Sequence, residues 1–333
     1  VLGLGIIGGG VMHLSPEHLY LPDPVLERLN ISPSDVADAI ESALIAKAEG
    51  RLHTAPKSAV LPGDGRYMMS TLAVGEDEGL TILKAVGVYP GNGARGLPTS
   101  TGAILALDAH TGRLRAVLGA AWVTAVRTAG LSAVAARKMA DPNAETIAFV
   151  GCGVQASSHL AAFRALFPLK KVFAVGRSAK STDRFVDEVR ALGLTAEVRD
   201  AETAIREADL VVSSITLDYS VVPFLDASWM KPGAFAAITD LFIPWKNESA
   251  GAFSSIYVDD LVQERASDKP MVPGHLITGD LTELATGGPV ARSDAQPSAF
   301  VFRGLALGDY AAASLALARA EASGAGQRVV PEA

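Results

Sequence analysis

The sequence has little of the chemistry that marks metal-binding and disulfide-stabilised proteins. Among its 333 residues Cys152 is the only cysteine, which excludes an intrachain disulfide and a cysteine-based zinc site. The six histidines are scattered without an i, i+4 pair, so no metal site is predicted. A single cysteine also fits a reducing compartment, and we expect a cytoplasmic protein.

Positive charge and long apolar runs are scarce as well. The net charge of −7 leaves no basic face for a phosphate backbone, so we expect no nucleic-acid partner. The apolar start, Val1 to Met12, has no basic flank and no membrane-length span. We therefore expect a strand or tether there, and no membrane partner.

The remaining composition is that of a compact globular protein, with 49% hydrophobic and 20% charged residues. Residues 24–49 have helical spacing, with Ser32 or Ser34 as the N-cap. Short apolar runs punctuated by glycine and proline predict a sheet over 58–107, followed by a turn at 108–112. A long helix is expected over 121–140, ended by Asp141-Pro142.

From Glu145 onward the pattern alternates between strand and helix. Six runs predict strands, namely "TIAFVG", "KVFAVG", "TAEVRD", "ADLVVSSIT", "AFAAITD" and "SSIYVDD". Repeated βα units with short apolar strands predict an α/β fold with a doubly wound parallel sheet. An alanine-rich helix is expected over 308–324.

A glycine-rich loop follows the first of these strands. Gly151, Gly153 and Ala156 fit the pattern G-x-G-x-x-G/A between a strand and a helix. The first glycine permits a tight turn, the second lets backbone amides approach a pyrophosphate, and the small third residue allows close packing. We predict a dinucleotide site here. The alternative interpretation of the same pattern is a tight turn that binds no ligand. The predicted cofactor-binding residues also include Val154, Gln155, Thr128, Ser214 and Thr216.

The end of the second strand bears on which dinucleotide is bound. An NAD site usually has an acidic residue there, which binds the ribose 2′-hydroxyl. This strand instead ends in Gly176-Arg177-Ser178, with Lys180 close behind. Because these side chains suit a 2′-phosphate, we favour NADP(H), with NAD(H) as the alternative.

Four charged residues are candidates for the chemistry. Lys84 interrupts an apolar strand. If it has no catalytic role, it is expected at an exposed strand position. Arg127 lies on an otherwise small and apolar helix, which indicates a carboxylate partner or an anionic ligand. Lys57 opens a strand, where it is otherwise an ordinary surface lysine. Asp240 ends a strand at the edge where such sheets bind ligands, and its alternative is a turn or helix cap.

Together these stretches resemble the ornithine cyclodeaminase/μ-crystallin family, which includes archaeal-type alanine dehydrogenases and ketimine or pyrroline-2-carboxylate reductases. The resemblance spans nearly the whole chain. It rests on "APKSAVLP", "LKAVGVYPGNGARGLPTSTGAILALDAHTG", "TAVRTAGLSAVAARKMA", "FVGCGVQASSHL" and "FRGLALGDYAAA".

The resemblance implies a role for each candidate. Lys57, Lys84 and Arg127 match residues that hold the substrate carboxylate. Lys84 also matches the lysine that shuttles protons, and Asp240 the aspartate that handles the substrate amine. It further implies a homodimer whose substrate-binding and dimerisation domain is 1–122 plus 306–333, with a Rossmann domain at 123–305.

Three functions remain open at this point. The first is an NAD(P)-dependent reductase or dehydrogenase acting on a small α-imino or α-amino acid. The second is a cyclodeaminase that uses bound NAD+ on ornithine or lysine and releases ammonia. The third is a non-enzymatic ligand-binding protein. The predicted NADP(H) site favours the first, because a cyclodeaminase recycles NAD+ internally.

Overall fold

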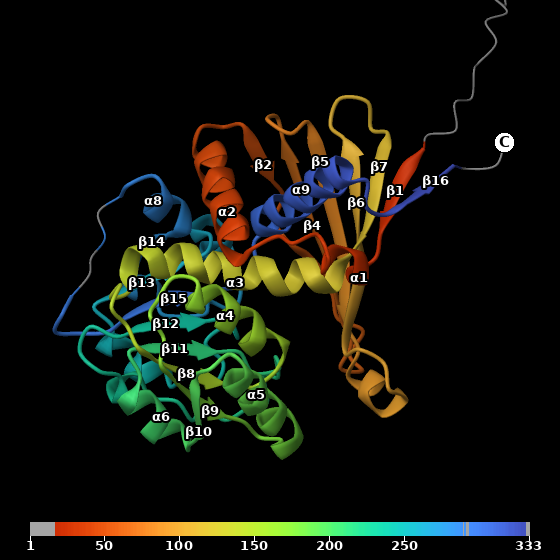
Figure 1. Cartoon of the computed structure of the whole chain (residues 1–333). Coiled ribbons are helices and arrows are strands. Elements are labelled where there is room, and N and C mark those ends of the chain that lie inside the picture. Colours follow the sequence, from red (N-terminus) through yellow and green to blue (C-terminus); the bar gives the residue numbers. More distant parts are fainter. Residues whose placement is uncertain (1–16, 289, 291–292, 331–333) are drawn as a thin grey trace, which may run out of the picture.

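The computed structural model describes residues 17–288, 290 and 293–330, so the predicted N-terminal strand or tether at Val1–Met12 lies outside the described residues. Two eight-stranded sheets organise the chain. Figure 1 shows them as separate halves, with helix α3 (Ala120–Met139) running between them.

The first sheet takes strands from both ends of the described chain, in the order β16-β1-β7-β6-β5-β4-β2, with β3 paired to β4. Its strands pair antiparallel except for β1 with β7. Their bounds are β1 His18–Leu21, β2 Leu52–Thr54, β3 Ser58–Val60, β4 Tyr67–Gly75, β5 Leu80–Val88, β6 Ser100–Asp108, β7 Leu114–Gly119 and β16 Gln327–Val329.

The second sheet is parallel throughout, in the order β10-β9-β8-β11-β12-β15-β13-β14. The chain runs outward from β8 to β10 and then returns to β11 on the other side of β8, which is the doubly wound arrangement predicted. Its strands are β8 Thr146–Val150, β9 Lys171–Val175, β10 Thr195–Val198, β11 Leu210–Ser213, β12 Phe235–Ile238, β13 Ser255–Val258, β14 Ile277–Asp280 and β15 Ser298–Val301.

The six strands predicted after Glu145 correspond to β8 through β13. The patterns missed β14 and β15, whose sequences, ITGD and SAFV, are short and contain small or polar residues. The helices are α1 Asp23–Leu26, α2 Pro33–Ala48, α3, α4 Val154–Arg164, α5 Ala179–Ala191, α6 Ala201–Glu207, α7 Leu261–Arg265, α8 Leu281–Ala285 and α9 Ala306–Ser323. Short 3-10 turns are η1 Pro90–Arg95, η2 Ala227–Trp229, η3 Asn247–Ala252 and η4 Gly274–Leu276.

Local sequence determines where the main helices begin and end. Ser32 caps α2 in a reciprocal capping box with Asp35, which decides between the two predicted caps. Helix α3 ends at Met139, before the Asp141-Pro142 pair that was expected to stop it. The apolar core follows α3, because one cluster of buried side chains contains residues of both sheets and of α2, α3, α4 and α9. The catalytic candidates therefore lie where rigid elements of both halves meet.

Candidate active site

A buried ion-pair cluster joins strand β5 to helix α9. Lys84 is 1% exposed, and its Nζ donates to Asp309 Oδ1 at 2.6 Å. Thr71, which pairs with Lys84 across the β4–β5 ladder, donates from Oγ1 to Asp309 Oδ2 at 2.8 Å. The exposed alternative for Lys84 is wrong, because Lys84 shares its strand face with the buried Ile82 and Val86.

Arg127 adds a second cation to this cluster from helix α3. The Nε atom of Arg127 lies 3.0 Å from Asp309 Oδ1, and the guanidinium carbon lies 5.0 Å from the centre of the Phe302 ring. The contact with Asp309 is an ion pair rather than an aligned hydrogen bond. The Nη1 atom of Arg127 is buried and has no hydrogen-bond partner among the described residues. A buried guanidinium with an unused donor is suited to an anionic ligand.

Lys57 approaches from the loop between β2 and β3. It is half-buried, and its Nζ donates to the carbonyl oxygen of Arg303 at 3.1 Å, on the segment between β15 and α9. Charges on Arg127 and Asp309 both affect the pKa of Lys57. The structure therefore brings Lys57, Lys84 and Arg127 together, although they come from different elements.

Burial decides the ionisation of the two lysines. Burial, with repulsion from Arg127, lowers the pKa of Lys84 to about 8 even though Asp309 opposes the change. Burial also lowers the pKa of Lys57 to about 8, against the attraction of Asp259. Burial alone would raise the pKa of Asp309, but Lys84 and Arg127 outweigh it and hold that pKa below its ordinary value. Near neutral pH both lysines are mostly charged and each can still release a proton.

The glycine loop has the geometry of a phosphate cradle. Gly151 has φ +99°, and a Cβ there would lie 2.6 Å from the carbonyl oxygen of Ser214. A Cβ on Gly153 would meet nothing within 4 Å, so open space lies before helix α4. No side chain caps that helix. The Ala156 amide donates to the Gly153 carbonyl at 3.1 Å, which leaves the amides of the exposed Val154 and of Gln155 available to an anion.

Two more predicted cofactor residues border this loop. Ser214 follows β11, which lies next to β8 at the point where the order of strands reverses. Its Oγ and the Oε1 of Gln155 are buried without a hydrogen-bond partner among the described residues. Unpaired buried oxygens beside an open cradle fit a polar ligand such as a dinucleotide.

The remaining cofactor candidates differ in exposure. Ala156 is buried under the loop, and Thr128 is buried on α3 with its hydroxyl donating to the Thr124 carbonyl at 2.7 Å. Thr216 is exposed. The residues after β9, Gly176, Arg177, Ser178 and Lys180, are all exposed. Arg177 lies near enough to Asp218 to lower the pKa of that carboxyl, after the larger effect of Ser220.

Among the described residues, the side-chain hydrogen bonds of Asp240 join it to Ser213 and Ile215 and not to the cation cluster. It is fully buried after β12, where Oδ1 accepts from Ser213 Oγ at 3.0 Å and Oδ2 from the Ile215 amide at 3.1 Å. Burial raises its pKa to about 7, with these bonds opposing the change. Asp240 therefore ties β12 to the loop after β11 and can also exchange a proton near neutrality.

Two acidic residues of the site were missed from the sequence. Asp309 is the counter-ion of Lys84 and Arg127, and Asp259 acts on Lys57. The signal for Asp309 was present, because an acid stands among apolar and small residues in the first turn of the alanine-rich α9. Asp259 had no comparable signal, since an acid directly after a strand and before a helix is common.

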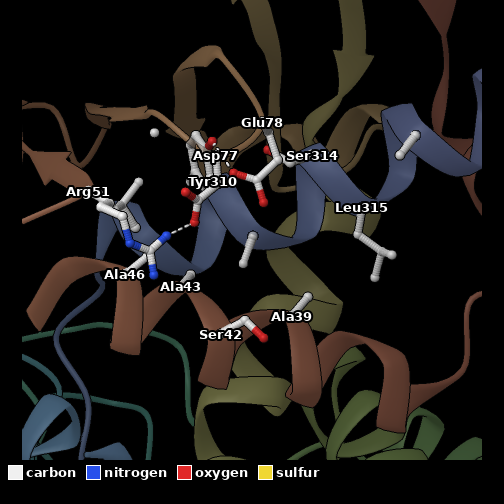
Figure 2. Close-up of a pocket in the computed structure, with 14 residues that line it drawn as sticks. Ala39, Ser42, Ala43, Ala46, Arg51, Asp77, Glu78, Tyr310, Ser314 and Leu315 are labelled. Carbon is white, nitrogen blue, oxygen red and sulfur yellow. Dashed lines mark hydrogen bonds and ion pairs between the residues drawn. The ribbon is translucent and has the colours of Figure 1, made fainter. Parts of the chain in front are cut away.

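A surface pocket lies apart from these residues. It has a volume of about 300 Å³. Figure 2 shows its lining side chains, which come mainly from α2, α9 and the β4–β5 turn. Tyr310 borders it and donates to Glu78 Oε2 at 2.7 Å, while Arg51 pairs with Asp77 at the rim. Tyr310 directly follows Asp309, so successive residues of α9 face this pocket and the cation cluster. No predicted site residue lines the pocket.

Metal and membrane sites are not indicated in the part of the chain that the structure describes. Within it, no cluster of histidine, cysteine, aspartate or glutamate side chains could hold a metal ion. None of the described helices combines the length and apolar character needed to cross a membrane.

Comparison with known proteins places these features in a family. The model of the ornithine cyclodeaminase/mu-crystallin family matches residues 21–324. An alanine dehydrogenase of Archaeoglobus fulgidus is 29% identical over 326 residues, covering 94% of this chain and 98% of the relative. A Delta(1)-pyrroline-2-carboxylate/Delta(1)-piperideine-2-carboxylate reductase of Azospirillum brasilense is 32% identical over 201 residues, covering 56% and 64%. The solved archaeal alanine dehydrogenase dimer with bound NAD has a TM-score of 0.83 at 27% identity, covering 94% of this chain and 99% of that one.

Proposed function

Because the chain belongs to the ornithine cyclodeaminase/mu-crystallin family, we propose that it is an NAD(P)H-dependent oxidoreductase acting on a small α-imino or α-amino acid. The proposed activity is that of a ketimine or Δ1-pyrroline-2-carboxylate reductase, or of an amino-acid dehydrogenase. The relatives named above include both kinds of enzyme.

The observation that carries the proposal is the unused donor of Arg127 in a cluster with surplus positive charge. The cluster contains three cations, Lys57, Lys84 and Arg127. Only two carboxylates, Asp309 and Asp259, act on them, so one positive charge is in excess near neutrality. A substrate carboxylate supplies the missing negative charge and an acceptor for Arg127 Nη1. A buried site of this kind binds an α-imino acid in one orientation, which is most of what the reaction requires.

The chain's own residues then divide the work. In this proposal Arg127 and Lys57 hold the substrate carboxylate. Lys84 contacts the same carboxylate and gives a proton to the substrate nitrogen. When bound, the nicotinamide supplies or accepts a hydride at the α-carbon. A lysine with a pKa of about 8 suits this proton transfer, because it is charged at neutral pH and releases a proton easily. We propose Asp240, with a pKa of about 7, as a second proton-handling group.

The cofactor is proposed to be NADP(H), with its pyrophosphate on the Gly151–Ala156 loop. The exposed Arg177, Ser178 and Lys180 would bind the 2′-phosphate. Two observations support NAD(H) instead. Asp218 lies near Arg177, where a carboxylate repels a phosphate and can accept from a ribose hydroxyl. The related archaeal alanine dehydrogenase has NAD bound. This is why NAD(H) remains the alternative.

The assembly and location follow the same reasoning. We propose a cytoplasmic homodimer, supported by the single cysteine and by the dimer of the related archaeal alanine dehydrogenase. We also propose the division into a domain of 1–122 plus 306–333 and a Rossmann domain at 123–305. The composition of the two sheets supports it, since the first uses strands from both ends of the described chain.

The test is a direct assay of imine reduction. Purified protein is incubated with Δ1-pyrroline-2-carboxylate or Δ1-piperideine-2-carboxylate and either NADPH or NADH, and the absorbance at 340 nm is followed. Rapid loss with NADPH is expected. If neither cofactor is consumed, and pyruvate with ammonia also gives no turnover, the reductase and dehydrogenase proposal is rejected. Ammonia release from ornithine or lysine with NAD+ then tests the cyclodeaminase alternative.

A further inference from the structure

One buried carboxylate beside the cation cluster is not used by the reaction proposed above. Asp259 follows β13 and is fully buried. Its Oδ2 accepts hydrogen bonds from two successive amides, Arg303 at 3.2 Å and Gly304 at 2.7 Å. Its Oδ1 is buried and accepts no hydrogen bond from any described residue. Such an oxygen is costly in the interior unless a positive charge compensates it.

Lys57 supplies that positive charge. Among the charged groups around Lys57, Asp259 has the largest effect and favours the ammonium form; Arg127 and Arg303 disfavour it, and Asp309 favours it. Burial raises the pKa of Asp259 to about 6, and the neighbouring Asp260 acts in the same direction. The two amides of the turn and Lys57 favour the ionised form. Lys57 and Asp259 lie farther apart than an ion pair, so their attraction is a longer-range electrostatic one and not a direct bond.

Both residues also hold the same turn. Asp259 binds the amides of Arg303 and Gly304, and Lys57 donates to the Arg303 carbonyl. Gly304 has φ +115°, and a Cβ on it would lie 3.6 Å from Lys57 Nζ. The turn leads from β15 directly into α9, which carries Asp309. The position of Lys57 therefore depends on a turn that Asp259 clamps.

We propose that Asp259 is a positioning residue for substrate binding, which holds the Lys57 ammonium charged and in place at the anion site. The inference rests on the proposed function, because it takes Lys57 as a ligand of the substrate carboxylate. Asp259 acts through Lys57 and through the 303–304 turn, without touching the substrate.

The test is carboxylate binding as a function of pH in the Asp259→Asn variant, which keeps the side-chain size and removes the charge. The probe is pyrrole-2-carboxylate, titrated by calorimetry into protein saturated with NADPH, from pH 6 to 9. Without its strongest favourable charge, the pKa of Lys57 falls below about 8, since Arg127 and Arg303 then act on it with only Asp309 opposing. We expect the loss of affinity at high pH to begin about one pH unit lower than in the wild type. KM is expected to follow, while kcat stays unchanged.

Two further variants separate positioning from a general structural role. Lys57→Arg remains charged throughout this range, so adding Asp259→Asn in that background is expected to leave the pH dependence unchanged. Asp260→Asn removes the adjacent acid, which caps α7 and pairs with Lys47, and is expected to keep the wild-type pH profile.

The outcomes distinguish the two proposals. If the wild type does not bind the carboxylate at all, the proposed function fails. If the wild type binds it and Asp259→Asn shows the same pH dependence, the role of Asp259 is refuted. Should Asp259→Asn not yield folded protein, Lys57→Arg alone is decisive. Between pH 7 and 9 that variant should lose less affinity than the wild type, because only Lys84 of the two lysines with a pKa of about 8 still titrates. An affinity loss equal to that of the wild type would show that Lys57 is not a titrating group of the anion site, and would overturn the inference.

Discussion

Replacing Asp309 by asparagine should remove the charge that holds two buried cations together. The asparagine can still accept the hydrogen bond from Thr71, so shape and one contact are kept. Lys84 and Arg127 lose their common counter-ion, with side chains only 1% and 6% exposed. Leaving buried charges uncompensated costs about 3–5 kcal/mol. Lys84 can escape part of this cost by losing its proton, but Arg127 cannot, so we expect a loss of about 3 kcal/mol at pH 7.

The pH dependence makes this expectation specific. The pKa of Asp309 is below its ordinary value, so its charge stabilises the fold above that ordinary value and the benefit is lost as pH falls. The difference between variant and wild type should therefore shrink toward pH 3. It should also shrink toward pH 9, where Lys84, with a pKa of about 8, is largely neutral in both proteins.

Urea unfolding at pH 3, 7 and 9, followed by tryptophan fluorescence and circular dichroism, measures this. Asp200→Asn, which alters the exposed cap of α6, is the matched control and should cost well under 1 kcal/mol. Asp309→Asn combined with Lys84→Met should recover part of the loss. A loss below about 1 kcal/mol at pH 7, or one that does not change with pH, would refute the assignment of Asp309 as the counter-ion.

Three further changes test the site. Arg177→Asp should raise the KM for NADPH by about tenfold or more with little change for NADH, because it places a carboxylate against the 2′-phosphate; equal effects on both cofactors in steady-state assays would remove Arg177 from the site. Lys84→Met should reduce kcat by about 10²-fold or more while cofactor binding, measured by fluorescence titration, is kept; near-normal turnover would make the lysine structural. Asp240→Asn should lower kcat by a similar factor with NADPH affinity unchanged; unchanged kcat with weaker NADPH binding would limit Asp240 to holding the loop after β11.

Local patterns were sufficient for most of the parallel-sheet half of the fold. The Gly151 loop, the strand before it and the helix after it are contiguous, so their geometry follows from short-range backbone preferences. The long α3 helix, which ends just before Asp141-Pro142, was predictable for the same reason. The β14 and β15 strands were missed because their short sequences carry weak apolar signals and gain their burial only from neighbouring strands.

The residues of the cation cluster were predictable from the sequence, but their contacts were not. Lys84 was ambiguous from the sequence, since a charged residue in a strand faces either solvent or the interior. Only the pairing that puts it on the face of Ile82 decides this. The isolated Arg127 predicted a carboxylate partner or an anionic ligand. The structure supplies Asp309 as the partner, while Nη1 of Arg127 bonds to none of the described residues. That Asp309 is the partner depends on how α9 packs across β4 and β5, which no local pattern specifies.

The bond between Lys84 and Asp309 joins positions 225 residues apart. On the ribosome, Lys84 and Arg127 emerge well before α9, and until then they have no counter-ion from that helix. The parallel sheet, β8 to β15, is synthesised as an uninterrupted stretch and can pair its strands in the meantime. The nascent chain can therefore form the glycine loop first. The ion pairs of Lys84 and Arg127 with Asp309 form only when synthesis has passed α9, the last helix of the described residues.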